Sequence, residues 1–408
     1  MEDRRSIMSE HHTPQLLGSF STYLSQMQRN KPLSFSNEAH LDPAKWRAKA
    51  RQAFDQAIGA PKFPAVQPRE TASVIHDGLE ITTLEWQLPF GWPTEAYLLR
   101  PAGSKEKLPG VLALHDHGAN KVHGKSKLVD TGENSSDIIN RYRDTYYGGR
   151  AWANELAKRG YAVLVHDIFP FESRRIRFNE IPGRVLDHMF TPPDKITEPE
   201  VGDTDPNMGA KLDSTLEDSF SHYNTFAIGM ENVIAKAIFA SGTTWPGIML
   251  SEDRIALSVL ASHPLVDANR LACCGLSLGG LRSNLLGGTS DSIRFSASIG
   301  FMTTWNDLIM HSCIDHTWML FIPRLPESMD FPDILSMRAP MPSMVIQSTE
   351  DPLFTLAEVK RAEKLLKESY RKAGDEEAFT MSWYSGGHRF DREMQEQVFT
   401  RCDRLMQS

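Results

Sequence analysis

From about Thr71 onward, apolar runs of strand length alternate with segments whose apolar residues recur at helical spacing. Eight runs have the length and composition of strands: ITTLEWQL, EAYLLRPA, VLAL, AVLV, LACCGLS, FSASIGF, PSMVIQS and FTMSWYS. Helix-like stretches such as RAWANELAKRG separate several of them. Apolar strands that alternate with helices are typical of a parallel sheet covered on both faces. We therefore predict an α/β fold with a mostly parallel, eight-stranded sheet over residues 71–408.

Residues 1–70 precede this pattern and predict a helical N-terminal extension. Asp42 and Pro43 suit the N-cap and the first position of a helix, and Gly59 and Pro61 would end it, so we expect a helix over residues 42–58.

Residues 170–223 are polar and rich in Pro, Asp and Gly. They form a stretch that is too long for an ordinary loop inside a compact domain. We predict a cap or lid insertion here, after which a helix over about residues 224–239 returns the chain to the core.

Composition and charge limit the classes of function. The 408-residue chain is 40% hydrophobic with a formal net charge of −8, which suits a globular enzyme and disfavours a nucleic acid or an anionic membrane surface as partner. The start MEDRRSIMSEHH is charged, and no stretch approaches the roughly 18 apolar residues of a membrane span. The four cysteines suggest neither a disulfide framework nor a spaced zinc site. We expect a cytoplasmic protein that acts on a small molecule, with a homo-oligomer left open.

The segment Gly275-Leu276-Ser277-Leu278-Gly279 matches the pattern G-x-S-x-G. It follows the apolar run LACC and precedes the helix-like LRSNLL, the strand-turn-helix context in which this pattern presents a nucleophilic serine. Glycines flank the serine because the turn is so sharp that side chains there would collide with neighbouring backbone. Ser277 is therefore the predicted nucleophile, and the N–H of Leu278 at the helix N-terminus is a predicted oxyanion donor. Because this pattern alone also arises by chance, the assignment depends on whether a suitable acid and histidine follow the serine.

Where this motif is catalytic, an acid and then a histidine follow the serine along the chain. Asp351 comes just after the run SMVIQS, and His388 lies in the glycine-flanked loop SGGHRF after the last predicted strand. The offset of 37 residues between them leaves room for one helix and one strand. We predict that Ser277, His388 and Asp351 form a catalytic triad. Glu350 is the close rival of Asp351, which we prefer because Pro352 biases it toward an extended loop position.

The segment 115–126 is open to three interpretations. The run HDHG at 115–118 follows the third predicted strand and resembles the H-G-x-G turn of esterases, in which the backbone N–H of His117 would be the second oxyanion donor. His115, His117 and His123 could instead share a metal ion, although no carboxylate or cysteine cluster accompanies them. Residues 119–126, ANKVHGKS, are a loose form of the phosphate-binding loop, but the following KLVDTGENSSD is weakly helical. We favour the first interpretation and predict no metal and no cofactor.

Three stretches carry a family resemblance: LALHDHGANKVHGK with RAWANELAKRGYAVLVHDIF, then LASHPLVDANRLACCGLSLGG, then STEDPLF with SGGHRF. They resemble the dienelactone hydrolase and acetyl-xylan esterase branch of the α/β-hydrolases, which is also similar to prolyl-oligopeptidase catalytic domains. The resemblance covers most of residues 75–395 and implies the α/β-hydrolase fold, ester hydrolysis through an acyl-enzyme, and an acid at Asp351. A peptidase or a carbon–carbon bond hydrolase would use the same residues. A catalytically silent protein of this fold and a nucleotide-binding protein are the alternatives from other classes.

Aromatic residues are the candidates for a substrate pocket. Phe169, Tyr223 and Trp305 are the three selected, and Phe171, Phe226 and Trp318 are further candidates, although aromatic residues more often pack in a core. Arg174, Arg175 and Arg177 could hold an acidic substrate or could form a solvated basic turn. The sequence leaves the acyl and alcohol groups of the substrate open.

Overall fold

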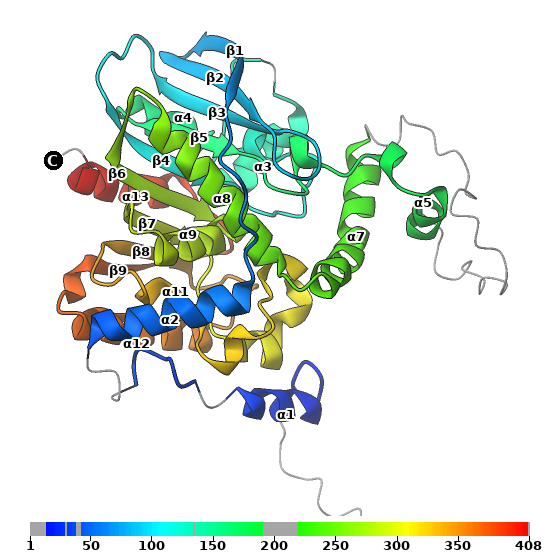
Figure 1. The fold of residues 1–408 in the computed structure, drawn as a ribbon, viewed down its shortest axis with the longest axis vertical. Coiled ribbons are helices and arrows are strands. Elements are labelled where there is room, and N and C mark those ends of the chain that lie inside the picture. Colours follow the sequence, from blue (N-terminus) through cyan, green and yellow to red (C-terminus); the bar gives the residue numbers. More distant parts are fainter. Residues whose placement is uncertain (1–13, 29–30, 38–41, 134, 191–218, 407–408) are drawn as a thin grey trace, which may run out of the picture.

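The computed structural model describes residues 14–28, 31–37, 42–133, 135–190 and 219–406, and a nine-stranded sheet forms its centre (Figure 1). The strand order across the sheet is β1-β2-β3-β5-β4-β6-β7-β8-β9. The strands are β1 (Arg69–His76), β2 (Leu79–Trp86), β3 (Thr94–Pro101), β4 (Leu108–Leu114), β5 (Ala162–His166), β6 (Val266–Leu276), β7 (Ile293–Ile299), β8 (Ser343–Ser348) and β9 (Phe379–Tyr384).

The sheet is mostly parallel, as predicted, but it has nine strands where eight were expected. The strands from β4 to β9 pair in parallel, whereas β1, β2 and β3 form an antiparallel edge that joins β5. The additional strand is β1, whose side chains are exposed or half-buried along its whole length. Such an edge strand lacks the apolar pattern by which the other eight were recognised.

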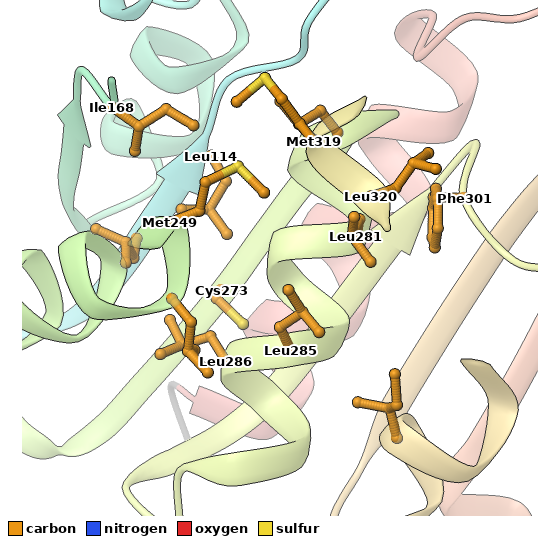
Figure 2. Packing of buried hydrophobic residues seen from close by; sticks show 14 of the residues in the cluster. Leu114, Ile168, Met249, Cys273, Leu281, Leu285, Leu286, Phe301, Met319 and Leu320 are labelled. Carbon is orange, nitrogen blue, oxygen red and sulfur yellow. The ribbon is translucent and has the colours of Figure 1, made fainter. Parts of the chain in front are cut away.

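Helices cover both faces of this sheet. One face carries α8 (Trp245–Ser262), α9 (Leu278–Thr289), α11 (Phe331–Ser336) and α12 (Leu356–Lys372), and the other carries α3 (Asp137–Tyr147), α4 (Trp152–Lys158) and α13 (Arg392–Met406). Neighbouring residues of β6 point to opposite faces, so Cys273 and Cys274 belong to different hydrophobic cores. Figure 2 shows part of the core beneath α8 and α9, in which Cys273 lies close to Leu285 and Leu286 of α9. A short helix, α10 (Trp305–Asp307), follows β7.

The N-terminal segment contributes α1 (Ser19–Met27) and α2 (Pro43–Ile58). The carboxylate of Asp42 accepts the N–H of Ala44 at 3.0 Å and that of Lys45 at 3.1 Å, and the left-handed Gly59 ends the helix, which confirms the helix expected over residues 42–58. One side of α2 is buried in the core of the sheet through Trp46, Ala50, Phe54 and Ile58. This helix is therefore part of the main body.

The predicted insertion is described over residues 170–190 and 219–223, and residues 191–218 lie outside the described residues. Its described part holds α5 (Gly183–Phe190) and the start of α7 (Phe220–Ala240), two helices that project from the body of the molecule (Figure 1). The rings of Phe190 and Phe226 stack across these two helices, 6.3 Å apart. Within the described residues no single helix is long and apolar enough to cross a membrane, and the pair α7 and α8, bent by 87°, meets that test by length and composition only.

Candidate active site

Ser277 stands at the junction between β6 and α9. Its backbone has φ 58° and ψ −118°, a conformation that is strained for a residue with a side chain. A Cβ atom added at Gly275 would lie 2.4 Å from the carbonyl oxygen of Leu114, and one at Gly279 would lie 2.1 Å from the same atom. Both glycines are therefore required by the turn. Leu278 is the first residue of α9, so its N–H has no partner within the helix.

His388 and Asp351 meet at the same edge of the sheet. Asp351 follows β8, and His388 lies in the loop between β9 and α13. The Nδ1 atom of His388 is 2.6 Å from Oδ2 of Asp351, and Oδ1 of that carboxylate accepts the N–H of Leu353 at 3.0 Å. Because a carboxylate only accepts hydrogen bonds, Nδ1 carries the proton and Nε2 keeps its lone pair. Glu350 is exposed, so Asp351 takes the place beside the imidazole.

The free nitrogen of His388 lies beside the cavity that Ser277 lines. Nε2 is buried and has no hydrogen-bond partner among the described residues. Ser277, Leu278 and His388 all line one cavity of about 350 Å³. Gly300, with φ 59°, allows the imidazole to approach, since a Cβ atom there would lie 2.9 Å from Cε1 of His388. The structure thus brings the three predicted residues together, with Asp351 directly behind the imidazole.

The predicted oxyanion loop contributes residues 116–118 to the same cavity. The carboxylate of Asp116 is buried and accepts hydrogen bonds from the hydroxyls of Tyr142 and Tyr147. Burial acts to raise the pKa of Asp116, but Lys127 and the two tyrosines outweigh it, so the pKa is lowered and the side chain is an anion. Gly118 has φ 51°, and a Cβ atom added there would overlap the hydroxyl of Tyr142. The Gly of HDHG is therefore required by the loop.

The three histidines that could have shared a metal ion have different partners. Nδ1 of His115 is 3.0 Å from the carbonyl oxygen of Asp116, Nε2 of His117 is 2.6 Å from Oε1 of Glu231, and Nδ1 of His123 is 3.1 Å from Oδ1 of Asn120. Burial lowers the pKa of all three imidazoles, that of His123 to about 4. In the part of the chain that the structure describes, no group of three or more His, Cys, Asp or Glu side chains could hold a metal ion.

The loop that resembles a phosphate-binding loop is filled by carboxylates of the chain itself. The N–H groups of Gly124 and Ser126 donate to Glu172 at 2.7 and 3.0 Å, and the N–H of Lys125 donates to Asp167 at 2.7 Å. The ammonium of Lys125 pairs with both carboxylates. The loop then enters a three-residue 3-10 turn, η1 (Lys125–Lys127), and not an α-helix. Anion binding by these amides is thus already satisfied, which argues against a nucleotide site.

The three aromatic residues selected for a substrate pocket do not line this cavity. Trp305 and Tyr223 are buried against Phe331 and Phe178, at ring distances of 3.9 and 6.0 Å. Phe169 is partly buried and packs against Phe90 and Trp245. They are core residues because the body of the protein offers them apolar contacts away from the cavity.

Arg174 does not belong to a solvated turn. Its guanidinium is buried, 3.2 Å from the carboxylate of Glu252, and donates to the carbonyl oxygen of Phe90 at 2.9 Å. Arg175 lies over the ring of Tyr223 at 5.0 Å, and Arg177 over that of Trp92 at 5.6 Å. None of the three arginines lines the cavity within the described residues.

The cavity wall consists largely of residues that the sequence did not single out. Its apolar part is formed by Tyr146, Ile228, Leu276, Phe301, Ile314, Leu320, Leu353 and Phe354, and its further polar groups are Glu231, Asp315, His316 and Thr317. Glu231 is the informative member, because its carboxylate binds the His117 imidazole, the Lys121 ammonium and, at 2.7 Å, the Thr317 hydroxyl. It is the one acidic residue of the apolar helix α7, a signal by which the sequence could have revealed it.

Comparisons with known proteins agree with this architecture. No family model matches the chain. A structure assigned as an acetyl xylan esterase of Bacteroides fragilis superposes with a TM-score of 0.62, covering 93% of this chain and 84% of its own, at 16% identity. A glucuronoyl esterase from Solibacter usitatus gives 0.57, covering 92% and 97% at 12% identity, and a methylesterase gives 0.55, covering 95% and 68% at 14% identity. The chain has the α/β-hydrolase fold.

One relative was found by sequence. YtaP of Bacillus subtilis (strain 168), assigned as a hydrolase, is 22% identical over 294 residues, which are 72% of this chain and 77% of YtaP. The resemblance to acetyl-xylan esterases is matched at the level of the fold, whereas the resemblance to dienelactone hydrolases stays a prediction.

Proposed function

We propose that the protein is a carboxylic ester hydrolase with Ser277 as nucleophile, His388 as general base and Asp351 as the carboxylate that orients the imidazole. The observation that carries the proposal is that His388 lines the same cavity as Ser277, while its Nδ1 is bound to Asp351 and its Nε2 has no hydrogen-bond partner among the described residues. Ester hydrolysis is the reaction named for all three of the similar structures above, and this supports an ester as the bond that is cleaved.

The residues allow an acyl-enzyme reaction in two halves. In the first, Nε2 of His388 accepts the proton of the Ser277 hydroxyl while its Oγ attacks the ester carbonyl carbon. The same proton is then donated to the alcohol oxygen as the carbon–oxygen bond breaks. In the second half a water molecule replaces the serine hydroxyl, His388 repeats the proton transfer, and the acid leaves. Asp351 stabilises the imidazolium in both halves.

The tetrahedral intermediate needs donors for its oxyanion. The N–H of Leu278 is free at the start of α9, where the helix dipole also favours a negative charge. The N–H of His117 is the second donor, and no described residue accepts a hydrogen bond from it. Both residues line the cavity beside Ser277.

Uncharged esters suit this cavity best. The charged residues among its described lining are Asp116, Glu231 and Asp315, and neither Lys nor Arg is among them. A carboxylate on the substrate would therefore find no counter-ion in the wall, because the ammonium groups of Lys127 and Lys121 are already paired with Asp116 and Glu231. The apolar residues around the serine favour a neutral acyl group.

The test is chemical labelling combined with one substitution. Intact mass after treatment with a fluorophosphonate probe should show a single adduct, located at Ser277, and Ser277→Ala should abolish both labelling and the hydrolysis of p-nitrophenyl acetate, with a loss of about 10³-fold or more in kcat. A folded Ser277→Ala variant that keeps most of its activity would overturn the assignment. Labelling at Ser277 without hydrolysis of any ester would move the proposal to amide or carbon–carbon bonds.

A further inference from the structure

Three consecutive carbonyl oxygens of the oxyanion loop are bound by cationic side chains. Nη1 of Arg282, on α9, donates to the carbonyl oxygen of His115 at 3.1 Å. The ammonium of Lys127 donates to the carbonyl oxygen of Asp116 at 2.8 Å and to that of His117 at 3.0 Å. Both cationic side chains are completely buried. Each peptide unit along this part of the loop thus has a positive charge on its carbonyl side.

The N–H of His117, the second of the two proposed oxyanion donors, belongs to one of these peptide units. The carbonyl of Asp116 and the N–H of His117 share one peptide bond, and in a trans peptide the two groups point in opposite directions. A cation at the carbonyl oxygen therefore sits behind the N–H, holds the plane of the peptide, and draws electron density away from the N–H hydrogen. In a buried site such polarisation strengthens the hydrogen bond that the N–H donates.

We propose that Lys127 is a positioning residue of the oxyanion hole, whose ammonium fixes and polarises the peptide units that carry the N–H groups of His117 and Gly118. Arg282 supports the preceding peptide unit in the same way. The inference rests on the proposed ester hydrolysis, because it assigns a role within the transition state of that reaction.

The surroundings of Lys127 leave its charge directed at the loop. The ammonium lies 3.6 Å from the carboxylate of Asp116, and over the rings of Tyr142 and Phe171 at 5.2 and 5.1 Å. The other charged groups that act on it are Lys121 and Glu172, and the buried imidazoles of His115 and His117 belong to the loop that it binds. Burial lowers the pKa of Lys127 to about 8, and the Asp116 carboxylate opposes this only in part. The polarising charge is therefore lost within an accessible range of pH.

Lys125 provides a matched control two positions earlier in the same 3-10 turn. It is as buried as Lys127, but its ammonium binds the carboxylates of Asp167 and Glu172 at 2.9 and 2.7 Å and no carbonyl of the oxyanion loop. Burial acts to lower its pKa, yet these carboxylates raise it well above the usual range. A loss of stability is expected from replacing either lysine, whereas only Lys127 is placed to affect the oxyanion.

The experiment measures kcat and KM for p-nitrophenyl acetate from pH 6 to 10 in the full-length wild type and in Lys127→Arg, Lys127→Met and Lys125→Met. Thermal unfolding and fluorophosphonate labelling are followed at each pH. We expect the wild-type kcat to fall above about pH 8 with KM nearly constant. Lys127→Arg should shift this decrease in kcat, the alkaline limb of the pH profile, to higher pH. Lys127→Met should lower kcat at pH 7 by about ten- to a hundredfold, less than the loss of an oxyanion donor itself, and should abolish the limb. Lys125→Met should keep it.

Two results would overturn the proposal: a wild-type kcat that stays level to pH 10 in folded protein, or an alkaline limb that Lys127→Arg leaves in place. Neither depends on the folding of the methionine variants. Absence of labelling at Ser277 at every pH would instead refute the ester hydrolase itself, so the two failures are distinguishable.

Discussion

Asp351→Asn is the sharpest perturbation of the proposed active site, because the structure determines how the amide will be oriented. Oδ1 of Asp351 accepts the N–H of Leu353 at 3.0 Å, whereas Oδ2 faces Nδ1 of His388 at 2.6 Å. In the variant the amide oxygen will keep the bond to the Leu353 N–H, which places the NH₂ group against Nδ1. That NH₂ group donates, so Nδ1 must become the acceptor and the proton moves to Nε2.

This change of tautomer should lower kcat by a large factor. An imidazole that carries its proton on Nε2 cannot accept the proton of Ser277, and an amide does not stabilise the imidazolium that forms. A wrong tautomer of this kind lowers kcat by about 10⁴-fold, which corresponds to about 5.5 kcal/mol of transition-state stabilisation. KM should change little, because Asp351 does not line the cavity within the described residues.

Glu350→Gln is the matched control. Glu350 is exposed and adjacent in the chain, and its amide variant should stay within roughly tenfold of the wild type. Both variants are compared with the wild type on p-nitrophenyl acetate, with thermal unfolding to confirm that each is folded. A large loss in Glu350→Gln together with a small one in Asp351→Asn would refute this reasoning and transfer the role of the acid to Glu350.

Two further substitutions test the surrounding structure. Gly279→Ala places a Cβ atom 2.1 Å from the carbonyl oxygen of Leu114, so it should destabilise the protein by about 3 kcal/mol or more in urea unfolding, and wild-type stability would contradict the sharp turn at Ser277. Burial raises the pKa of Glu252 from 4.5 to about 7, although Arg174 opposes the shift. A raised carboxyl pKa stabilises the fold fully below pH 4.5, and this contribution is lost as the pH rises through 7. Glu252→Gln should therefore gain up to about 3 kcal/mol relative to the wild type between pH 5 and 8, and a constant difference would contradict the shift.

The positions of Ser277, Asp351 and His388 at one edge of the sheet could be predicted because the residues around them carry local signals. The sharp turn at Ser277 requires glycine two positions before and two positions after the serine. This requirement can be read directly from the five-residue motif in the sequence. Asp351 and His388 each follow an apolar strand, and the carboxyl ends of parallel strands meet at one edge of a sheet. The order of these residues along the chain, together with the strand pattern, was therefore enough to predict that they lie at the same edge of the sheet, without any knowledge of side-chain contacts.

The cavity wall could not be predicted in this way, because burial depends on packing between distant segments. Trp305 and Phe354 both lie shortly after a strand, yet Trp305 packs against Phe331 whereas Phe354 lines the cavity. Ile228 and Ile314 are large exposed hydrophobic residues that belong to its rim. The same limit hid β1, whose edge position leaves no apolar alternation in the sequence.

Three imidazoles line the cavity within the described residues, and their hydrogen bonds distinguish them as bases. In His117, Nδ1 accepts the N–H of Ala119 at 3.1 Å and Nε2 donates to Glu231 at 2.6 Å. Both ring nitrogens are therefore engaged, and the side chain is not available to accept a proton. In the proposed reaction, His117 would contribute only its backbone N–H.

His316 has one free ring nitrogen but lacks the second requirement of a base. Its Nε2 lies 2.9 Å from the carbonyl oxygen of Leu353 and must donate to it. At this nitrogen the protonated ring would therefore be stabilised only by a neutral carbonyl and not by a carboxylate. Burial lowers the pKa of His316, which makes its remaining lone pair less ready to accept a proton. In His388 the donating nitrogen is bound to the carboxylate of Asp351. The attraction between this carboxylate and the ring becomes stronger when the imidazole is protonated. Of the three, His388 alone combines a ring nitrogen that has no hydrogen-bond partner among the described residues with a bond from its other nitrogen to a buried carboxylate.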